Sequence, residues 1–218
     1  MIKTVVGIIM LLLFISCNAD KKVESDNIQQ EEKRDKEGEY QKINTDAALI
    51  ATALMAAPEN SRDNAKVIGF NMAGDFVTLR EGDNEFVCLA DNPNKEGFSV
   101  ACYHKSLEPF MARGRALKAE GKDGKEIFDI REKEVKSGKL DMGEIGATLH
   151  IYSGPEAVYS PNAGEVPKAK YRYVVYMPYA TAESTGLPES PIAPNHPWIM
   201  NPGTHKAHIM ISPLAESE

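Results

Sequence analysis

Residues 86–103 read FVCLADNPNKEGFSVACY, and this stretch decides the predicted fold. An apolar run rich in β-branched and aromatic residues lies at each end of it. The polar segment Asn92–Gly97 between the two runs contains a proline and a glycine. This pattern is typical of two antiparallel strands joined by a loop. The stretch therefore predicts a β-hairpin, and with it an antiparallel sheet.

The same stretch predicts a disulfide bond. If Ala90 pairs with Val100, the antiparallel register places Cys88 directly opposite Cys102, where two cysteines lie close enough to be bridged. Closing a loop of about 15 residues would stabilise the fold by roughly 3 kcal/mol in the chain-entropy model. A metal site formed by the two cysteines and His104 is the alternative. The sequence adds no second C-x-x-C or nearby H-x-x-x-H to complete it, so the disulfide is favoured.

Upstream of the hairpin, the pattern predicts one helix and two strands. Apolar residues recur at helical spacing over residues 49–57, and Asn44–Asp46 supply an N-cap and an acidic first turn. Lys66–Phe70 and Phe76–Arg80 are the expected strands. The composition of Glu81–Asn84 predicts a tight turn that pairs the second of these strands with the first strand of the hairpin.

Downstream, two helices and three strands are expected. Ser106 is expected to cap the first helix and Asp123 the second, which ends at Ser137–Gly138. The residues expected to face inward are Leu107, Phe110, Met111 and Leu117 in the first helix, and Ile127, Ile130 and Val135 in the second. The strands are expected at Thr148–Tyr152, Tyr171–Met177 and Ala207–Ile211. The whole pattern predicts a single α+β domain over residues 43–218, in which a few helices pack on an antiparallel sheet.

Residues 1–16 have the features of a secretion signal. Lys3 precedes the apolar run Val5–Ile15, whose eleven residues would span roughly 16 Å as a helix. That is about half of a ~30 Å hydrocarbon core, which is too short for a permanent membrane span. The run ends in Phe14-Ile15-Ser16-Cys17, which resembles a bacterial lipobox. An uncleaved anchor and a simple secretory signal are the alternatives.

The lipobox resemblance implies that Cys17 becomes the mature N-terminus and carries two or three acyl chains. Several chains anchor a protein stably, because each buried CH₂ contributes about 0.8 kcal/mol. Residues 17–42 are mostly charged or amide-bearing and are expected to form a disordered tether between the lipid and the domain. We therefore expect a lipid-anchored protein of the bacterial cell envelope, with the outer membrane favoured and the domain in the periplasm or at the cell surface.

The charge of the chain excludes one class of partner. Lys and Arg number 25 against 32 Asp and Glu, a formal net charge of −7. A nucleic-acid-binding protein needs a basic surface that releases counterions from phosphates, so no nucleic-acid partner is expected. The membrane, contacted through the N-terminal lipid, is the partner that the sequence predicts.

The C-terminal region carries a second, weaker signal. His196, His205 and His208 lie within 13 residues, which makes a Zn or Cu site an alternative to a protein without a cofactor. In an extended segment His205 and His208 would point to opposite faces, so they converge only if the chain turns between them. A long proline-rich loop, flanked by Tyr176, Tyr179 and Trp198, could also form an aromatic groove beside the histidines. No nucleophile elbow, P-loop, H-E-x-x-H or dinucleotide fingerprint is present, which favours a non-enzyme.

Two blocks of sequence resemble a known family. The first is Leu79-Arg80-Glu81-Gly82 followed by Asn84, Phe86, Cys88 and Leu89. The second runs from Trp198-Ile199-Met200 through Gly203-Thr204 to Ala207-His208-Ile209-Met210. Together they resemble the signatures of a family of uncharacterised bacterial envelope proteins. The resemblance implies no activity or ligand.

Both blocks set polar residues among apolar ones, which makes Arg80, Glu81 and His208 candidate site residues. Two functions follow from the sequence. The favoured one is an envelope binding or structural module. The alternative is a metal-binding protein or metal-dependent enzyme that uses the C-terminal histidines.

Overall fold

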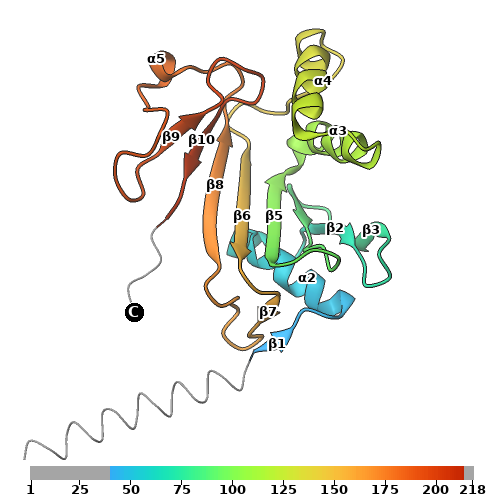
Figure 1. Ribbon diagram of the computed structural model, residues 1–218. Helices are drawn as coiled ribbons and strands as arrows, with labels where there is room; N and C mark the ends of the chain where they lie inside the picture. Colours follow the sequence, from blue (N-terminus) through green and yellow to red (C-terminus); the bar gives the residue numbers. More distant parts are fainter. Residues whose placement is uncertain (1–39, 214–218) are drawn as a thin grey trace, which may run out of the picture. The chain divides into compact units, whose positions relative to one another are not determined.

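The computed structural model describes residues 40–213 (Figure 1). The predicted signal peptide, Cys17 and nearly all of the tether lie outside the described residues. The described part is an α+β fold built on a mixed, mostly antiparallel sheet of eight strands, which confirms the predicted class. Between residues 40 and 213, no helix has the length and apolar character needed to cross a membrane.

The strands of the sheet lie in the order β3-β2-β4-β5-β6-β8-β10-β9. Their bounds are β2 (Lys66–Phe70), β3 (Phe76–Arg80), β4 (Phe86–Leu89), β5 (Phe98–His104), β6 (Thr148–Gly154), β8 (Lys170–Tyr176), β9 (Trp198–Met200) and β10 (His208–Ile211). A separate pair consists of β1 (Gln41–Lys42) and β7 (Val158–Tyr159). Because β1 falls within residues 17–42, the ordered fold begins before the predicted end of the tether.

Four α-helices and two short 3₁₀ turns accompany these strands in the described residues. They are α2 (Asp46–Met55), η1 (Glu59–Ser61), η2 (Lys105–Leu107), α3 (Glu108–Ala119), α4 (Gly124–Lys136) and α5 (Ala182–Thr185). Thr45 caps α2 through its side chain, as predicted. Asp123 caps α4, also as predicted, and it does so in a reciprocal capping box with Glu126 that was not predicted from the sequence. The predicted cap at Ser106 is wrong, because η2 precedes α3 and the residue at the N-cap of η2 is His104.

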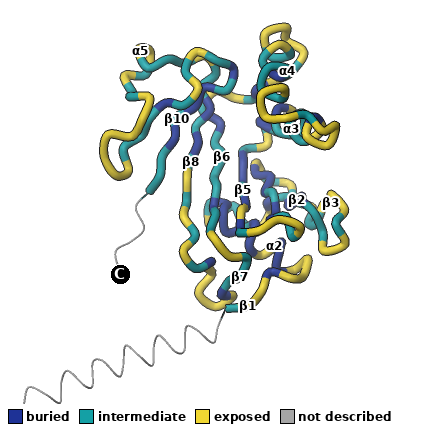
Figure 2. Tube along the Cα trace, in the orientation of Figure 1, coloured by how far each residue is buried: buried dark blue, intermediate teal, exposed yellow. Residues whose placement is uncertain are grey.

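The hairpin of residues 86–103 is confirmed. Strands β4 and β5 pair antiparallel with Cys88 opposite Cys102, and a disulfide joins the two. Both cysteines are fully buried. Figure 2 shows buried residues along β5, so the disulfide lies within the core rather than at the surface.

The predicted hairpin between β3 and β4 is wrong. Strand β2 lies between them and pairs antiparallel with β3 and parallel with β4. Residues 81–85 instead cross the start of β2, where the N–H of Asp83 donates to the carbonyl of Asn64 at 3.0 Å. A Cβ added at Gly82 would lie 2.4 Å from the backbone of Asn64 and Ala65, so only glycine fits this crossing.

The helices cover the two faces of the sheet separately. Successive residues of a strand point to opposite faces, and two buried clusters follow this alternation. The cluster on the α2 side includes Leu49, Ala53, Val67, Phe86, Cys88, Val100, Cys102 and Tyr152. The cluster beneath α3 includes Ile68, Val87, Tyr103, Leu107, Phe110, Val174, Tyr176 and Met210. The fold therefore has two half-cores, one on each side of a central sheet.

Candidate functional site

The structure separates the three candidate residues of the two sequence blocks. The guanidinium of Arg80 donates to the carbonyls of Ala65 and Arg62, both at 2.6 Å, and so fixes the start of β2. Glu81 is exposed and forms a 3.2 Å ion pair with Lys66. Strand β3, which contains Arg80, lies six strands from β10, which contains His208. At about 4.8 Å per strand, that is roughly 29 Å, so these residues do not form one site.

The three C-terminal histidines contact different partners. Nδ1 of His196 lies 2.7 Å from the carbonyl of Pro197, and Nδ1 of His208 lies 2.8 Å from the carbonyl of Lys206. His205 is fully buried against aromatic rings. Residues 40–213 contain no group of three or more His, Cys, Asp or Glu that could hold a metal ion. The spacing of the histidines along the chain is thus the sole support for the metal site.

A cavity of about 450 Å³ lies where the end of α2 meets β6 and β8. Its lining comes from three parts of the chain: the end of α2 and the turn that follows it, strand β6, and strand β8. The lining residues are Met55, Ala56, Ala57, Pro58, Glu59, Arg62, His150, Tyr171 and Tyr173. We call this the tyrosine-lined cavity. It combines an aromatic and aliphatic wall with a few polar groups, which is the usual composition of a small-molecule site.

The tyrosine rings of this cavity belong to a row along the sheet. Tyr171 stacks on Tyr152 with ring centroids 4.2 Å apart and an interplanar angle of 14°. Tyr173 continues the row, 6.2 Å from Tyr171 and inclined by 16°. His150 meets Tyr173 edge to face at 5.2 Å. These contacts hold the rings in one orientation before any ligand binds.

Hydrogen bonds and burial set the polar character of the cavity. The hydroxyl of Tyr171 donates to the carbonyl of Met55 at 3.2 Å and ties β8 to the end of α2. Burial lowers the pKa of His150, so its imidazole is neutral at neutral pH. Burial also raises the pKa of Tyr171. His150 and Tyr171 therefore contribute no charge to the wall at neutral pH, and its charged lining residues are Arg62 and Glu59.

Arg62 lines the cavity, and one of its guanidinium nitrogens, Nη1, has no partner within residues 40–213. Its Nε donates to the carbonyl of Ala57 at 3.2 Å and its Nη2 to the carbonyl of Met55 at 3.4 Å. No hydrogen bond or ion pair within residues 40–213 uses Nη1. Exposed Glu59 also lines the cavity. Arg62 is thus held in place by two of its nitrogens while the third can serve a ligand.

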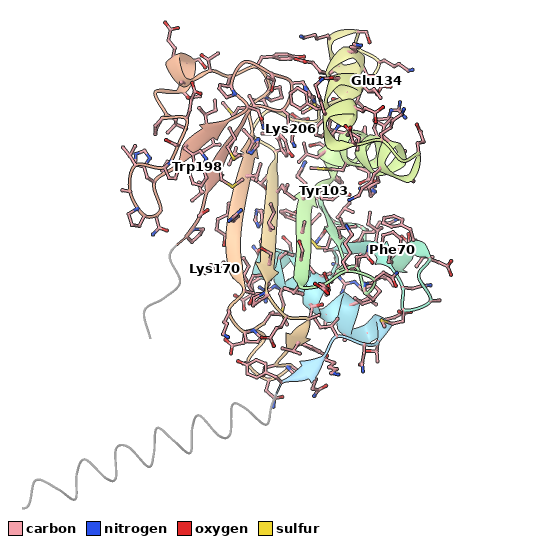
Figure 3. All side chains as sticks on the ribbon, in the orientation of Figure 1. Phe70, Tyr103, Glu134, Lys170, Trp198 and Lys206 are labelled. Atoms are coloured by element: carbon pink, nitrogen blue, oxygen red, sulfur yellow. A yellow bond between two sulfur atoms is a disulfide. The ribbon has the colours of Figure 1, made fainter. Side chains whose placement is uncertain are left out.

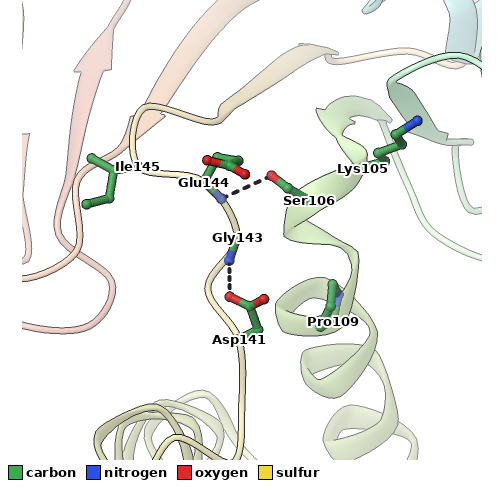
Figure 4. Close-up of a pocket in the computed structure, with 7 residues that line it drawn as sticks. All are labelled: Lys105, Ser106, Pro109, Asp141, Gly143, Glu144 and Ile145. Carbon is green, nitrogen blue, oxygen red and sulfur yellow. Dashed lines mark hydrogen bonds between the residues drawn. The ribbon is translucent and has the colours of Figure 1, made fainter.

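A second cavity, of about 550 Å³, lies beside the start of α3 (Figure 4). Ser106 lines it, and its Oγ lies 2.8 Å from Nδ1 of His104. The backbone N–H of Glu144 donates to the same Oγ, and that of Gly143 donates to Asp141. A serine beside an imidazole is a feature of acyl-transfer sites, but such sites also need free N–H donors for an oxyanion. Both of these N–H groups already donate to protein atoms, so neither is free to bind an oxyanion. The Ser106 hydroxyl instead links His104 to the backbone at Glu144.

The tyrosine-lined cavity was not predicted from the sequence. The aromatic groove expected beside the long loop involved Tyr176, Tyr179 and Trp198, none of which lines either cavity. Tyr176 is buried in the core beneath α3, and Trp198 packs against that core. The alternation of Tyr171 and Tyr173 about Arg172 was the available signal, because it places both rings on one face of a strand.

Comparison of the chain with models of protein families, with curated proteins and with solved structures found no match. The assignment of the site therefore depends on its own geometry. Of the two cavities, the tyrosine-lined one has both an oriented aromatic wall and an uncommitted donor. We take it as the candidate binding site.

Proposed function

We propose that the protein is a lipid-anchored binding module of the bacterial envelope, and that its folded domain binds a ring-shaped ligand in the tyrosine-lined cavity. The row of nearly parallel tyrosine rings beside the free Nη1 of Arg62 is the observation that carries the proposal. The lipobox-like residues that end in Cys17 support the anchor. The outer membrane is the favoured location, with the domain in the periplasm or at the cell surface.

The proposed binding mode follows from the cavity's lining. A sugar or other ring with an apolar face can pack on Tyr173 and the edge of His150, and each good ring contact contributes about 0.5–1.5 kcal/mol beyond the buried area. Hydroxyl, carbonyl or carboxylate groups at the ligand's edge can accept from Arg62, and donor groups can bond to Glu59. Because the rings are already oriented, little conformational entropy is lost on binding.

The disulfide supports the proposed location. Disulfides form and persist in oxidising compartments outside the cytosol. The Cys88–Cys102 bond is compatible with a domain that folds after export. It also leaves no free cysteine among the described residues, so Cys17 is the one thiol of the chain left to receive a lipid.

Ligand-observed NMR tests the binding proposal. The purified full chain is mixed with chitotriose, whose amino-sugar rings have apolar faces and polar edges, and saturation transfer from protein to sugar is measured. We expect transfer to the wild type and loss of most of it in Tyr173→Ala. Tyr179→Ala is the matched control, because Tyr179 is an exposed tyrosine outside the cavity. Equal transfer in wild type and Tyr173→Ala, or none in the wild type, would contradict the proposal for sugar rings.

Metabolic labelling with an alkyne-bearing fatty acid tests the anchor. The wild-type chain is expected to incorporate the label in a bacterial host and to fractionate with membranes, whereas Cys17→Ser is expected to do neither. Ser16→Ala is the matched control, because it keeps a small residue before the cysteine. Label on Cys17→Ser at the wild-type level would refute lipidation at this position.

The metal-handling alternative is tested by native mass spectrometry of the same protein. A stoichiometric zinc or copper adduct that disappears in His205→Ala or His208→Ala would favour a metal site at the C-terminal histidines. A metal-free mass after incubation with either ion would favour the binding module.

A further inference from the structure

Three buried side-chain nitrogens lack a hydrogen-bond partner within residues 40–213, and they belong to two residues that both contact the ring of Phe110. They are Nε of Arg131 and both ring nitrogens of His205. Arg131 is 8% exposed and His205 is 0% exposed. Leaving a buried polar group unpaired costs about 1–3 kcal/mol. Because no protein atom within residues 40–213 pairs with these nitrogens, we expect a ligand or an ordered water molecule to do so.

Arg131 enters the core from α4. Its guanidinium carbon lies 3.9 Å from the centroid of the Phe110 ring, and its Nη1 donates to the carbonyl of Phe110 at 3.2 Å. A Cβ at Gly114 of α3 would lie 2.9 Å from that Nη1, so the glycine makes room for the cation. This residue was missed by the sequence prediction, which placed Ile127, Ile130 and Val135 inward. Those three are half-buried, and Arg131 is the buried residue of α4.

His205 lies against the same ring. Its imidazole meets Phe110 at 5.8 Å and Phe128 of α4 at 4.7 Å, both edge to face. Burial, and then the charge of Arg131, lowers the pKa of His205 to about 4. The imidazole is therefore neutral at neutral pH. A neutral imidazole carries one N–H, which is available here as a donor.

The charges around the cluster are predominantly positive. Lys206, which is half-buried, follows His205 in the chain, and Figure 3 shows it at the end of the sheet that faces α3 and α4. The charges of Lys206 and Lys136 also disfavour protonation of His205, whereas that of Glu132 favours it. Glu132 is already paired with Lys136 at 3.1 Å. Tyr176 of β8, whose burial raises its pKa to about 12, contributes no charge.

Within residues 40–213, Arg131 and Lys206 therefore lack a counter-ion. In the part of the chain that the structure describes, no Asp or Glu oxygen lies within 4 Å of either cation. Burying a cation without an anion is costly, and the aromatic ring of Phe110 offsets only part of that cost. Water could satisfy the orphaned nitrogens, but it would not neutralise the charge.

We propose that Arg131, His205 and Lys206 form a binding site for a small monovalent anion such as chloride. The anion would accept from Nε of Arg131 and from the imidazole N–H, and its charge would offset one of the two positive charges of Arg131 and Lys206. It would link α4 to the loop that precedes β10 and so stabilise the C-terminal part of the sheet. Because an anion also favours the imidazolium form of His205, anion binding and protonation reinforce each other. The site is independent of the tyrosine-lined cavity.

Chloride titration of the purified full chain tests the site. Chloride replaces gluconate at constant ionic strength, and binding is read from the broadening of the ³⁵Cl NMR line. We expect saturable broadening in the wild type, with tighter binding at pH 5 than at pH 7.5, by at most tenfold per pH unit. Arg131→Met should weaken binding at least tenfold. Arg113→Met is the matched control, because Arg113 is already paired with Glu134.

Two gentler variants keep the test valid if Arg131→Met does not fold. Lys206→Met removes a half-buried charge and should weaken chloride binding severalfold. His205→Phe keeps an aromatic ring and should abolish the pH dependence of binding. No saturable broadening in the wild type, as expected if water alone fills the cluster, would overturn the proposal. So would chloride binding that is equal in wild type and Lys206→Met, or pH-dependent binding that persists in His205→Phe.

Discussion

Cys88 and Cys102 face each other across β4 and β5 with their Cα atoms 4.0 Å apart, and a disulfide joins them within the α2-side core. The pair closes a loop over a sequence separation of 14 residues. The two strands that it joins lie in the middle of the eight-stranded sheet. In the unfolded chain, the bond therefore holds together the two segments that form these middle strands.

Removing this bond should lower the free energy of unfolding. In the chain-entropy model a loop of this length is worth about 3 kcal/mol, and the double variant Cys88→Ala/Cys102→Ala also loses buried sulfur contacts. We expect a loss of about 3–4 kcal/mol in urea unfolding of the double variant. Reduction of the wild type should produce a similar loss. Unchanged stability in both experiments would show that the bond does not form in solution.

Gly82→Ala should destabilise the fold by about 2 kcal/mol or more, because the new Cβ would lie 2.4 Å from backbone atoms of residues 64 and 65 that cannot move aside cheaply. Gly124→Ala is the matched control. Nothing lies within 4 Å of a Cβ at Gly124, and alanine favours the helix more than glycine does. Thermal unfolding of the two variants measures the difference. A Gly82→Ala variant as stable as the control would argue against the close crossing of residues 81–85 over β2.

The free energy of unfolding should fall as the pH falls from about 6.5 to about 4. In that window an unfolded His205, with its ordinary pKa near 6.5, binds a proton, whereas the buried imidazole, with a pKa of about 4, does not. The contribution of His205 to the free energy of unfolding is fully present above pH 6.5. It decreases by roughly 3 kcal/mol as the pH falls to about 4. Urea unfolding in gluconate buffers measures it. His205→Phe should reduce the slope without abolishing it, because burial also lowers the pKa values of His150 and His208. An unchanged slope in that variant would place the titrating group elsewhere.

Tyr171→Phe should separate the two roles of Tyr171. Loss of the hydroxyl removes the hydrogen bond to the carbonyl of Met55 and should cost about 1 kcal/mol of stability. The ring remains, so the proposed ligand should bind with nearly wild-type affinity. Tyr179→Phe, which removes an exposed hydroxyl, should change neither property. Loss of ligand binding in Tyr171→Phe without loss of stability would mean that the hydroxyl contacts the ligand directly.

Local patterns predicted the fold well where each element depends on its own residues. The register of the 86–103 hairpin follows from alternating apolar residues about a Pro- and Gly-containing loop, and the caps at Thr45 and Asp123 follow from their side chains. Strand order was not accessible in this way. The insertion of β2 between β3 and β4 depends on contacts between residues 64–66 and 80–84, and no local pattern contains them.

The candidate sites were harder to predict because they combine distant segments. The tyrosine-lined cavity needs the end of α2, near residue 57, to meet β8, near residue 172. The proposed anion site combines Arg131 of α4 with His205, which lies more than 70 residues further along the chain. Arg131 is buried, whereas a hydrophobicity pattern assigns buried positions to apolar residues. The histidine spacing did identify His205 as a residue of interest, but for a metal rather than for an anion.

NMR of the full chain with ¹³C-labelled tyrosine rings tests the central claim most directly, because the eight tyrosines report on each candidate region separately. Chitotriose is titrated into the labelled protein and the ring signals are followed. The proposed site predicts saturable shifts of Tyr171 and Tyr173, with Tyr176 and Tyr179 unchanged. Shifts confined to Tyr176 and Tyr179, beside the C-terminal histidines, would contradict the account and place the binding site at the long loop.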